Sequence, residues 1–113
     1  MRAGQLSELL KFRARTGSVN DGRGNVRDVF TDQFEAWADM RLRPGSEVFT
    51  AARLEGRVPY SVKVRRSPDT ERITTGWMAR DRHGRDYSVE APGPDPHDRG
   101  ALHMLLVLNT RSV

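Results

Sequence analysis

The sequence contains no cysteine, so disulfide bonds and thiolate metal sites are excluded. No stretch approaches the run of about 18 apolar residues that a membrane-spanning helix needs, and we expect no membrane partner. With 113 residues, the chain is long enough to bury one core without a metal or a disulfide to hold it together. We therefore expect a single domain covering residues 1–113.

The sequence also lacks any concentration of charge of one sign. The formal net charge is +4, and residues 1–57 and residues 58–113 each contribute +2. This even distribution argues against a dedicated nucleic-acid arm. Arginine supplies 17 of the 19 basic residues, which coding bias in a GC-rich genome explains best; bidentate contacts to phosphate or carboxylate are the alternative. The first ten residues have no sustained apolar segment, so we expect no signal peptide and synthesis in the cytoplasm.

Most of the chain alternates apolar and polar residues with a period of two, which is typical of half-buried strands. This pattern predicts strands at residues 6–15, 26–42, 57–66, 73–81, 86–91 and 101–109, with a polar break at 31–32. The beginning of the first segment also fits a helical turn. The last segment is apolar on both faces from Leu105 to Leu108, which predicts a central strand covered on two sides.

Segments rich in glycine and proline predict the connections. Residues 16–25 combine glycines, which permit positive φ, with side chains that favour turns, so a long mobile loop is expected there. Residues 92–100 read PGPDPHDRG and predict an extended, mobile loop. A tight hairpin turn is expected at His83-Gly84.

The alternation stops between residues 44 and 56, where the spacing becomes helical. Ser46 is a candidate N-cap and Gly56 a candidate C-terminal stop. A helix of about 8–10 residues is too short to be stable alone. It must therefore pack its apolar face, Val48, Phe49 and Ala52, on the sheet. Together these elements predict a mainly β fold, a small barrel or sandwich of five to seven strands with one short crossing helix.

No catalytic or metal-binding constellation is evident. His83, His97 and His103 lie in a turn, a loop and a strand, without metal-ligand spacing. A solvated loop explains His97 and its neighbouring aspartates better than a cation site does, and His103 is better explained as a partly buried, hydrogen-bonded residue than as a base. No serine elbow or carboxylate pair is placed for catalysis. We expect no enzymatic activity and no cofactor.

The two tryptophans, Trp37 and Trp77, have Arg41 and Arg80 nearby in the sequence. Such residues form a stacking platform for nucleic acid when their rings are exposed. Packing at the edge of the core, or a contact between subunits, is the more common role of tryptophan in a small β protein, and we favour it here.

Several segments follow one another in a characteristic order. MRAGQL precedes a basic strand, the loop DGRGN, WADMR leading to PGSEVFTAARLEG, then YSVKVR, DRHGRDYSVEA and a last apolar strand. This order resembles the phage head–tail joining family, the small head-completion or stopper proteins of tailed phages and gene transfer agents. That family usually has a short turn in place of PGPDPHDRG and a more alternating final strand. The resemblance implies a small β-barrel, SH3-like or related, with a crossing helix.

The resemblance also implies a structural function in the neck of a virion or phage-like particle. A ring of six or twelve copies, made in the bacterial cytoplasm, would lie between the portal-adaptor protein and a tail-terminator or tail protein. It would retain packaged double-stranded DNA, without sequence specificity, and dock the tail. The loop facing the channel and DNA would comprise Asn20, Asp21, Gly22, Arg23, Gly24, Asn25 and Arg27. Subunit or neck contacts would involve Arg43, Glu47, Arg53 and Glu55, while the apolar face of the helix packs on the barrel.

Three alternatives remain at the level of sequence. In the first, the loop at 16–25 touches a neighbouring subunit or the adaptor instead of the channel. In the second, the chain is a tail-terminator-type neck protein. In the third, the chain is a small β-barrel that binds nucleic acid as a free module, and the monomer is then expected to bind tightly and with strong salt dependence.

Overall fold

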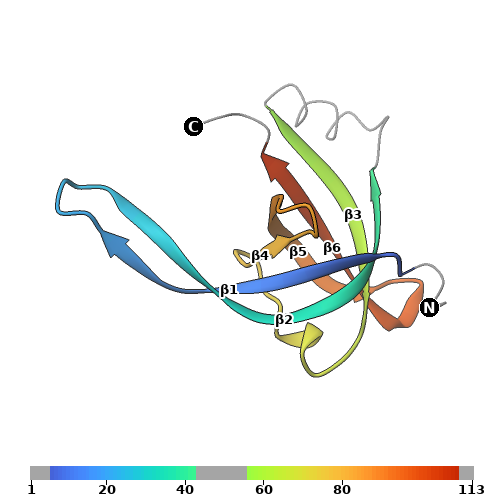
Figure 1. The fold of residues 1–113 in the computed structure, drawn as a ribbon. Helices are drawn as coiled ribbons and strands as arrows, with labels where there is room; N and C mark the ends of the chain where they lie inside the picture. Colours follow the sequence, from blue (N-terminus) through green and yellow to red (C-terminus); the bar gives the residue numbers. More distant parts are fainter. Residues whose placement is uncertain (1–5, 43–55, 110–113) are drawn as a thin grey trace.

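A six-stranded antiparallel sheet closes on itself to form a barrel in the computed structural model (Figure 1). The structure describes residues 6–42 and 56–109. The strands, in the order β1-β2-β3-β6-β5-β4 around the barrel, are β1 Glu8–Asn20, β2 Val26–Leu42, β3 Arg57–Arg65, β6 Asp98–Asn109, β5 Asp86–Asp95 and β4 Met78–Arg80. The predicted mainly β barrel is confirmed.

The helical content of the described part is one short 3-10 turn, η2 Thr70–Arg72. The predicted crossing helix, with Val48, Phe49 and Ala52 on its apolar face, lies outside the described residues. Within residues 6–42 and 56–109, no helix is long and apolar enough to cross a membrane.

The core fills the barrel because alternate residues of each strand point inward. The largest fully buried side chains are Tyr87, Phe12, Leu10, Met104, Leu106, Val62, Val64 and Val89. Strand β6 lies between β3 and β5, and its consecutive residues Leu106 and Val107 are only 0% and 5% exposed. Burial of successive residues confirms that this strand is covered on both faces there.

Aromatic rings extend the core toward the side where β1 and β2 leave the barrel. The ring of Phe12 lies 5.4 Å from that of Phe34, which lies 6.1 Å from Trp77. Arg72 covers Trp77 with its guanidinium carbon 5.9 Å from the ring centroid. Trp77 therefore packs at the edge of the core, as favoured from the sequence.

The loop predicted at residues 16–25 is wrong in its extent, because both flanking strands continue into it. Strand β1 runs to Asn20 and β2 starts at Val26, and cross-strand pairing joins them along their full length. Gly17 sits opposite Val29 without a positive φ, so this glycine acts as an ordinary strand residue. Pairing gives the inward-facing backbone groups of both strands hydrogen-bond partners that a loop would lack.

The polar break predicted at residues 31–32 is also wrong, since β2 passes through it. The register between β1 and β2 shifts instead at Phe12/Arg13 and at Arg15/Gly17. Such bulges insert an extra residue, bend the strands and increase their twist while the pairing continues.

The proline-rich loop predicted at residues 92–100 is a strand hairpin. Strand β5 continues to Asp95 and β6 begins at Asp98. Beyond Ser88, the described pairing of β5 involves β6 alone. Pro92 and Pro94 therefore lie on an edge, where a missing N–H costs no ladder hydrogen bond.

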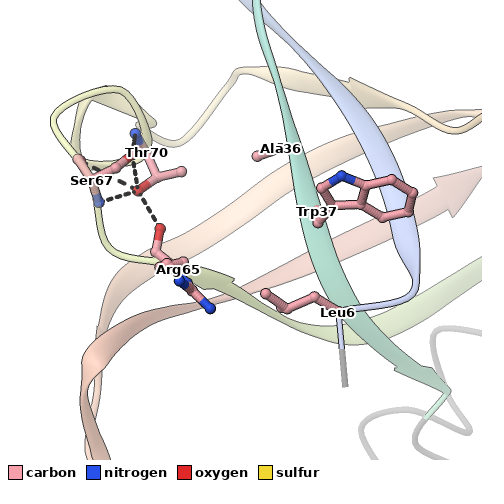
Figure 2. Close-up of a pocket in the computed structure, with 6 residues that line it drawn as sticks. All are labelled: Leu6, Ala36, Trp37, Arg65, Ser67 and Thr70. Atoms are coloured by element: carbon pink, nitrogen blue, oxygen red, sulfur yellow. Dashed lines mark hydrogen bonds between the residues drawn. The ribbon is translucent and has the colours of Figure 1, made fainter. Parts of the chain in front are cut away.

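Strand β4 is shorter than the predicted segment 73–81, because a polar turn precedes it. Buried Thr70 holds this turn: its Oγ1 donates to the carbonyl of Arg65 at 2.7 Å and accepts from the backbone N–H of Ser67 at 2.8 Å (Figure 2). A second turn follows, in which the N–H of Trp77 donates to the carbonyl of Thr74 and Gly76 has φ of 97°.

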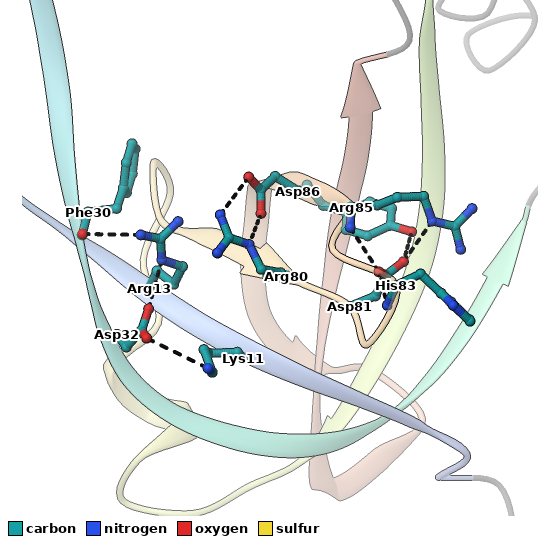
Figure 3. A network of polar contacts seen from close by, with 10 residues as sticks. Lys11, Arg13, Phe30, Asp32, Arg80, Asp81, His83, Arg85 and Asp86 are labelled. Carbon is teal, nitrogen blue, oxygen red and sulfur yellow. Dashed lines mark hydrogen bonds and ion pairs between the residues drawn. The ribbon is translucent and has the colours of Figure 1, made fainter.

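The predicted turn at His83-Gly84 is confirmed, and Asp81 organises it (Figure 3). Its carboxylate accepts from the backbone N–H groups of His83 and Arg85 at 2.8 and 3.0 Å. The Arg85 guanidinium and the Tyr87 hydroxyl each donate to the other oxygen at 2.8 Å. Burial alone would raise the pKa of Asp81, but these hydrogen bonds outweigh it and lower the pKa to about 2.

The lowered pKa makes Asp81 a source of acid sensitivity. A carboxyl with an ordinary pKa of 3.8 when unfolded and about 2 when folded stabilises the protein above pH 3.8. This contribution disappears as the pH falls through 2, and it amounts to about 2 kcal/mol. In urea unfolding, the wild type should lose about that much more free energy between pH 4 and pH 2 than Asp81→Asn does. Parallel pH profiles would contradict this.

Substitutions in the core should lower the free energy of unfolding far more than substitutions in the arm. Phe12 is fully buried, so Phe12→Ala should lower the free energy of unfolding by about 3–5 kcal/mol. Val19 is 54% exposed, and Val19→Ala should change it by less than about 0.5 kcal/mol. Denaturant unfolding of the two variants measures this, and similar losses would show that the ribbon belongs to the folding core.

Candidate functional site

The ribbon formed by β1 and β2 projects from the barrel as an arm (Figure 1). We call residues 15–29 the arm, residues 20–25 its tip, and the remainder its stem. Every residue of the arm is exposed. A projecting, fully exposed ribbon adds little to the core and is therefore available for contacts outside the subunit.

The tip is a turn held by hydrogen bonds, and it contains six of the seven residues predicted for the channel-facing loop. Asp21 accepts from the backbone N–H groups of Arg23 and Asn25 at 2.7 and 3.3 Å, and from the Asn25 amide at 3.1 Å. Asn20 accepts from the N–H of Gly22 at 2.9 Å. The bond from Arg23, followed by that from Asn25, lowers the pKa of Asp21. The turn thereby fixes the backbone of the exposed residue Arg23 at the tip of the arm.

Ion pairs neutralise the base of the arm but not its end. Arg13 pairs with Asp32 at 2.8 Å (Figure 3), and Arg15 pairs with Asp28 at 3.2 Å. Among the described residues, no carboxylate pairs with Arg23 or Arg27. The outer part of the arm therefore presents two guanidinium groups to other molecules.

The stem has one apolar face beside Arg27. In the register, Val19 lies opposite Arg27 and Val29 lies opposite Gly17, so all four residues share a face. Val19 is 54% exposed and Val29 is 38% exposed. Because Gly17 has no side chain and open space around its Cα, the Val29 side chain is accessible.

A second apolar surface lies where β1 begins. Trp37 pairs with Leu9, lies on the outer face of β2 and is 49% exposed. Glu35 is exposed on the same outer face, two residues before Trp37. Trp37 also lines a pocket of about 530 Å³ with Leu6, Ala36, Arg65, Ser67 and Thr70 (Figure 2). Leu9 and Glu35 line a separate pocket with Lys11, Arg80, Asp81, Arg82 and Gly84. We call Leu9, Glu35 and Trp37 the Trp37 face.

The tryptophans do not form a nucleic-acid stacking platform together. Trp77 packs against Phe34 and Arg72 at the edge of the core, whereas Trp37 lies on the outside of β2. The nearby arginines are engaged elsewhere, because Arg41 pairs with Asp39 and Arg80 binds Asp86. This alternative is therefore wrong.

The histidines also have structural partners. His103 Nε2 lies 2.7 Å from Ser61 Oγ, which confirms the expected hydrogen-bonded role. The backbone N–H of His97 donates to the carboxylate of Asp95, which also pairs with Lys63 at 3.2 Å. In the described part of the chain, no three His, Asp or Glu side chains are grouped to hold a metal ion.

Some predicted site residues lie outside the described residues. They are the interface candidates Arg43, Glu47, Arg53 and Glu55, and the helix residues Val48, Phe49 and Ala52. The sequence analysis missed the apolar stem face and the Trp37 face. The strand was predicted correctly at residues 26–30, but its partner at residues 16–20 was predicted as a loop, so the face that the two strands share was not recognised.

Comparisons with known proteins agree with this architecture. Residues 1–110 match the family model described as phage head completion protein. The solution structure of protein SF1141 from Shigella flexneri 2a is similar, with a TM-score of 0.65 and 18% identity over 99% of this chain and 100% of that chain. A chain of the native gene transfer agent virion is similar with a TM-score of 0.59 and 19% identity, over 95% and 97% of the two chains.

At these identities, the two solved structures show the shared fold alone. No curated protein matches the chain. The family model, in contrast, spans nearly the whole sequence. The chain therefore belongs to the phage head completion protein family and is a structural virion protein, not an enzyme.

Proposed function

We propose that this protein forms a closed ring in the particle neck, between the portal-adaptor protein and a tail-terminator or tail protein. The ring, of six or twelve copies, retains packaged DNA and provides the docking surface for the tail. The observation that carries this proposal is the exposed arm, which projects from the barrel of a head completion protein (Figure 1). Its tip bears Arg23, which pairs with no carboxylate among residues 6–42 and 56–109.

The tip suits contact with packaged DNA. Arg23 is exposed, and no carboxylate of the described residues neutralises it. A guanidinium binds backbone phosphate without reading sequence, which is what retention of any packaged genome requires. Several copies of the tip directed into a channel would combine a steric barrier with attraction to the phosphates.

The body of the barrel suits contacts with neighbouring proteins. Its outer strand faces carry both signs of charge, as in the pairs Arg57–Glu90 and Arg80–Asp86. Polar, mixed surfaces are common in specific, non-obligate interfaces. We further propose that Arg43, Glu47, Arg53 and Glu55 contribute to subunit or neck contacts.

Electron microscopy of the assembled particle neck tests the position of the ring. The proposal expects density for this barrel between the portal-adaptor and the tail. Density beside the tail tube would favour a tail-terminator-type protein instead. Tight, salt-sensitive binding of nucleic acid by the free monomer would favour an independent binding module.

Shortening the arm should separate folding from DNA retention. Residues 16–29 are replaced by Asn-Gly, which joins the paired residues Arg15 and Phe30 by a two-residue turn. The melting temperature should change by less than about 4 °C, since no core residue is removed. Particles carrying this variant should release their DNA. Particles that hold DNA as the wild type does would show that the arm does not close the channel.

The charge of Arg23 should affect DNA retention more than the shape of its side chain does. Arg23→Glu places a carboxylate against phosphate and should increase the rate of DNA release by about tenfold or more at low salt. Arg23→Lys keeps the charge and serves as the matched control. DNA release is measured by nuclease sensitivity of purified particles. Equal DNA release from both variants would show that Arg23 does not contact DNA in the channel.

A further inference from the structure

Large exposed apolar side chains occur at two places in the described part of the chain. Val19, Val26 and Val29 lie on the arm, whereas Trp37 and Leu42 lie on the half of β2 that belongs to the barrel. A monomer leaves both places in contact with water, which is unfavourable in proportion to the apolar area. Each copy of the chain thus carries two separate apolar surfaces.

The two surfaces of one molecule cannot meet. Gly17, opposite Val29, and Leu9, opposite Trp37, are separated by eight positions along β1. At about 3.3 Å per residue, this separation is about 26 Å along a paired ribbon. Covering the Trp37 face with an arm therefore requires the arm of another copy, which every ring supplies in equal number.

The charges beside the two apolar surfaces are complementary. Arg27 flanks Val19 on the stem, and among the described residues it has no ion-pair partner. Glu35 flanks Trp37 on β2, and no carboxylate–cation pair involves it there. Lys11 lies opposite Glu35, and Arg80 and Arg82 line a pocket with it. These three cations are paired with other carboxylates, Asp32, Asp86 and Glu8 respectively. A docked stem can therefore bring Arg27 to Glu35 while its valines cover Trp37.

We propose that the arm stem of each copy docks on the Trp37 face of the next copy, with Val19 and Val29 against Trp37 and Arg27 beside Glu35. This inference rests on the ring proposed above and names the contact that closes it. The contact is heterologous, since a different surface is used on each side, and such contacts generate rings. The tip, with Arg23, remains free of this contact.

Engineered disulfides test the contact directly, because the chain has no cysteine of its own. Gly17→Cys lies on the stem face and Leu9→Cys lies beside Trp37. These positions are too far apart to bond within one chain. Particles carrying both substitutions should give a ladder of disulfide-linked chains up to the full ring. Gly17→Cys with Ser88→Cys, at an exposed position on β5, is the control and should give none.

Adding Trp37→Ala to the cysteine pair should reduce cross-linking by about tenfold, as expected for a central interface tryptophan. Trp37→Phe should retain most of it. Thermal unfolding of each variant verifies the fold, since Trp37 is half exposed and outside the buried core. A ladder that is unchanged by Trp37→Ala in a folded protein would overturn the inference.

Charge reversal gives a second, independent test. Arg27→Glu alone and Glu35→Arg alone each place like charges together and should abolish cross-linking between identical copies. An equimolar mixture of the two should restore it, because each arm then meets an opposite charge on the other variant. Failure of the mixture would exclude the Arg27–Glu35 pairing.

The outcomes distinguish this inference from the proposed function. A neck ring that retains DNA but gives no ladder would overturn the contact and leave the function intact. A ladder in concentrated protein, with no copies in the neck, would support the contact and overturn the function.

Discussion

The structure depends on how strand β1 uses its two edges. Lys11, Phe12 and Arg13 pair with β2 on one side and with β4 on the other, and this double pairing closes the barrel. Strand β4 has only three residues, so the closure ends at Arg13. Beyond that point β1 and β2 have only each other and leave the barrel as the arm. The register shifts on either side of Arg13 bend and twist the ribbon where it departs.

The barrel was predictable from sequence because its alternation reflects burial. Residues such as Val62, Val64 and Val89 are both periodic in the sequence and buried in the core. Residues 26–29 of the arm were predicted as strand, but residues 16–20 were not, because they are exposed and lie in a segment rich in glycine and turn-forming residues. The strands of the arm form through pairing between residues as far apart in the sequence as Arg15 and Phe30, while local preference at residues 16–20 favoured a turn. The tip itself was recognisable, since Asn20, Asp21 and the glycines are local turn residues.

An isolated two-stranded ribbon is only marginally stable in water. Three features support this one: the hydrogen-bonded turn around Asp21, the ion pair of Arg15 with Asp28, and a hydroxyl contact of 2.8 Å between Thr16 and Thr31. Exposed pairs of this kind each contribute little. Charged residues along the ribbon also discourage the edge-to-edge pairing that exposed strands invite. The arm is therefore ordered enough to present defined faces, yet it gains substantial stability only from a partner.

This balance fits the proposed ring, in which one chain must exist both as a free subunit and as a ring component. A contact made by a stem face with two valines and one charge is small, so free copies associate weakly. In a closed ring every copy makes the contact twice, once with its arm and once with its Trp37 face. Binding to a preformed neck surface raises the effective concentration of neighbouring copies and makes the same contact favourable. The proposed contact would thus close the proposed ring at the particle and leave the subunit free elsewhere.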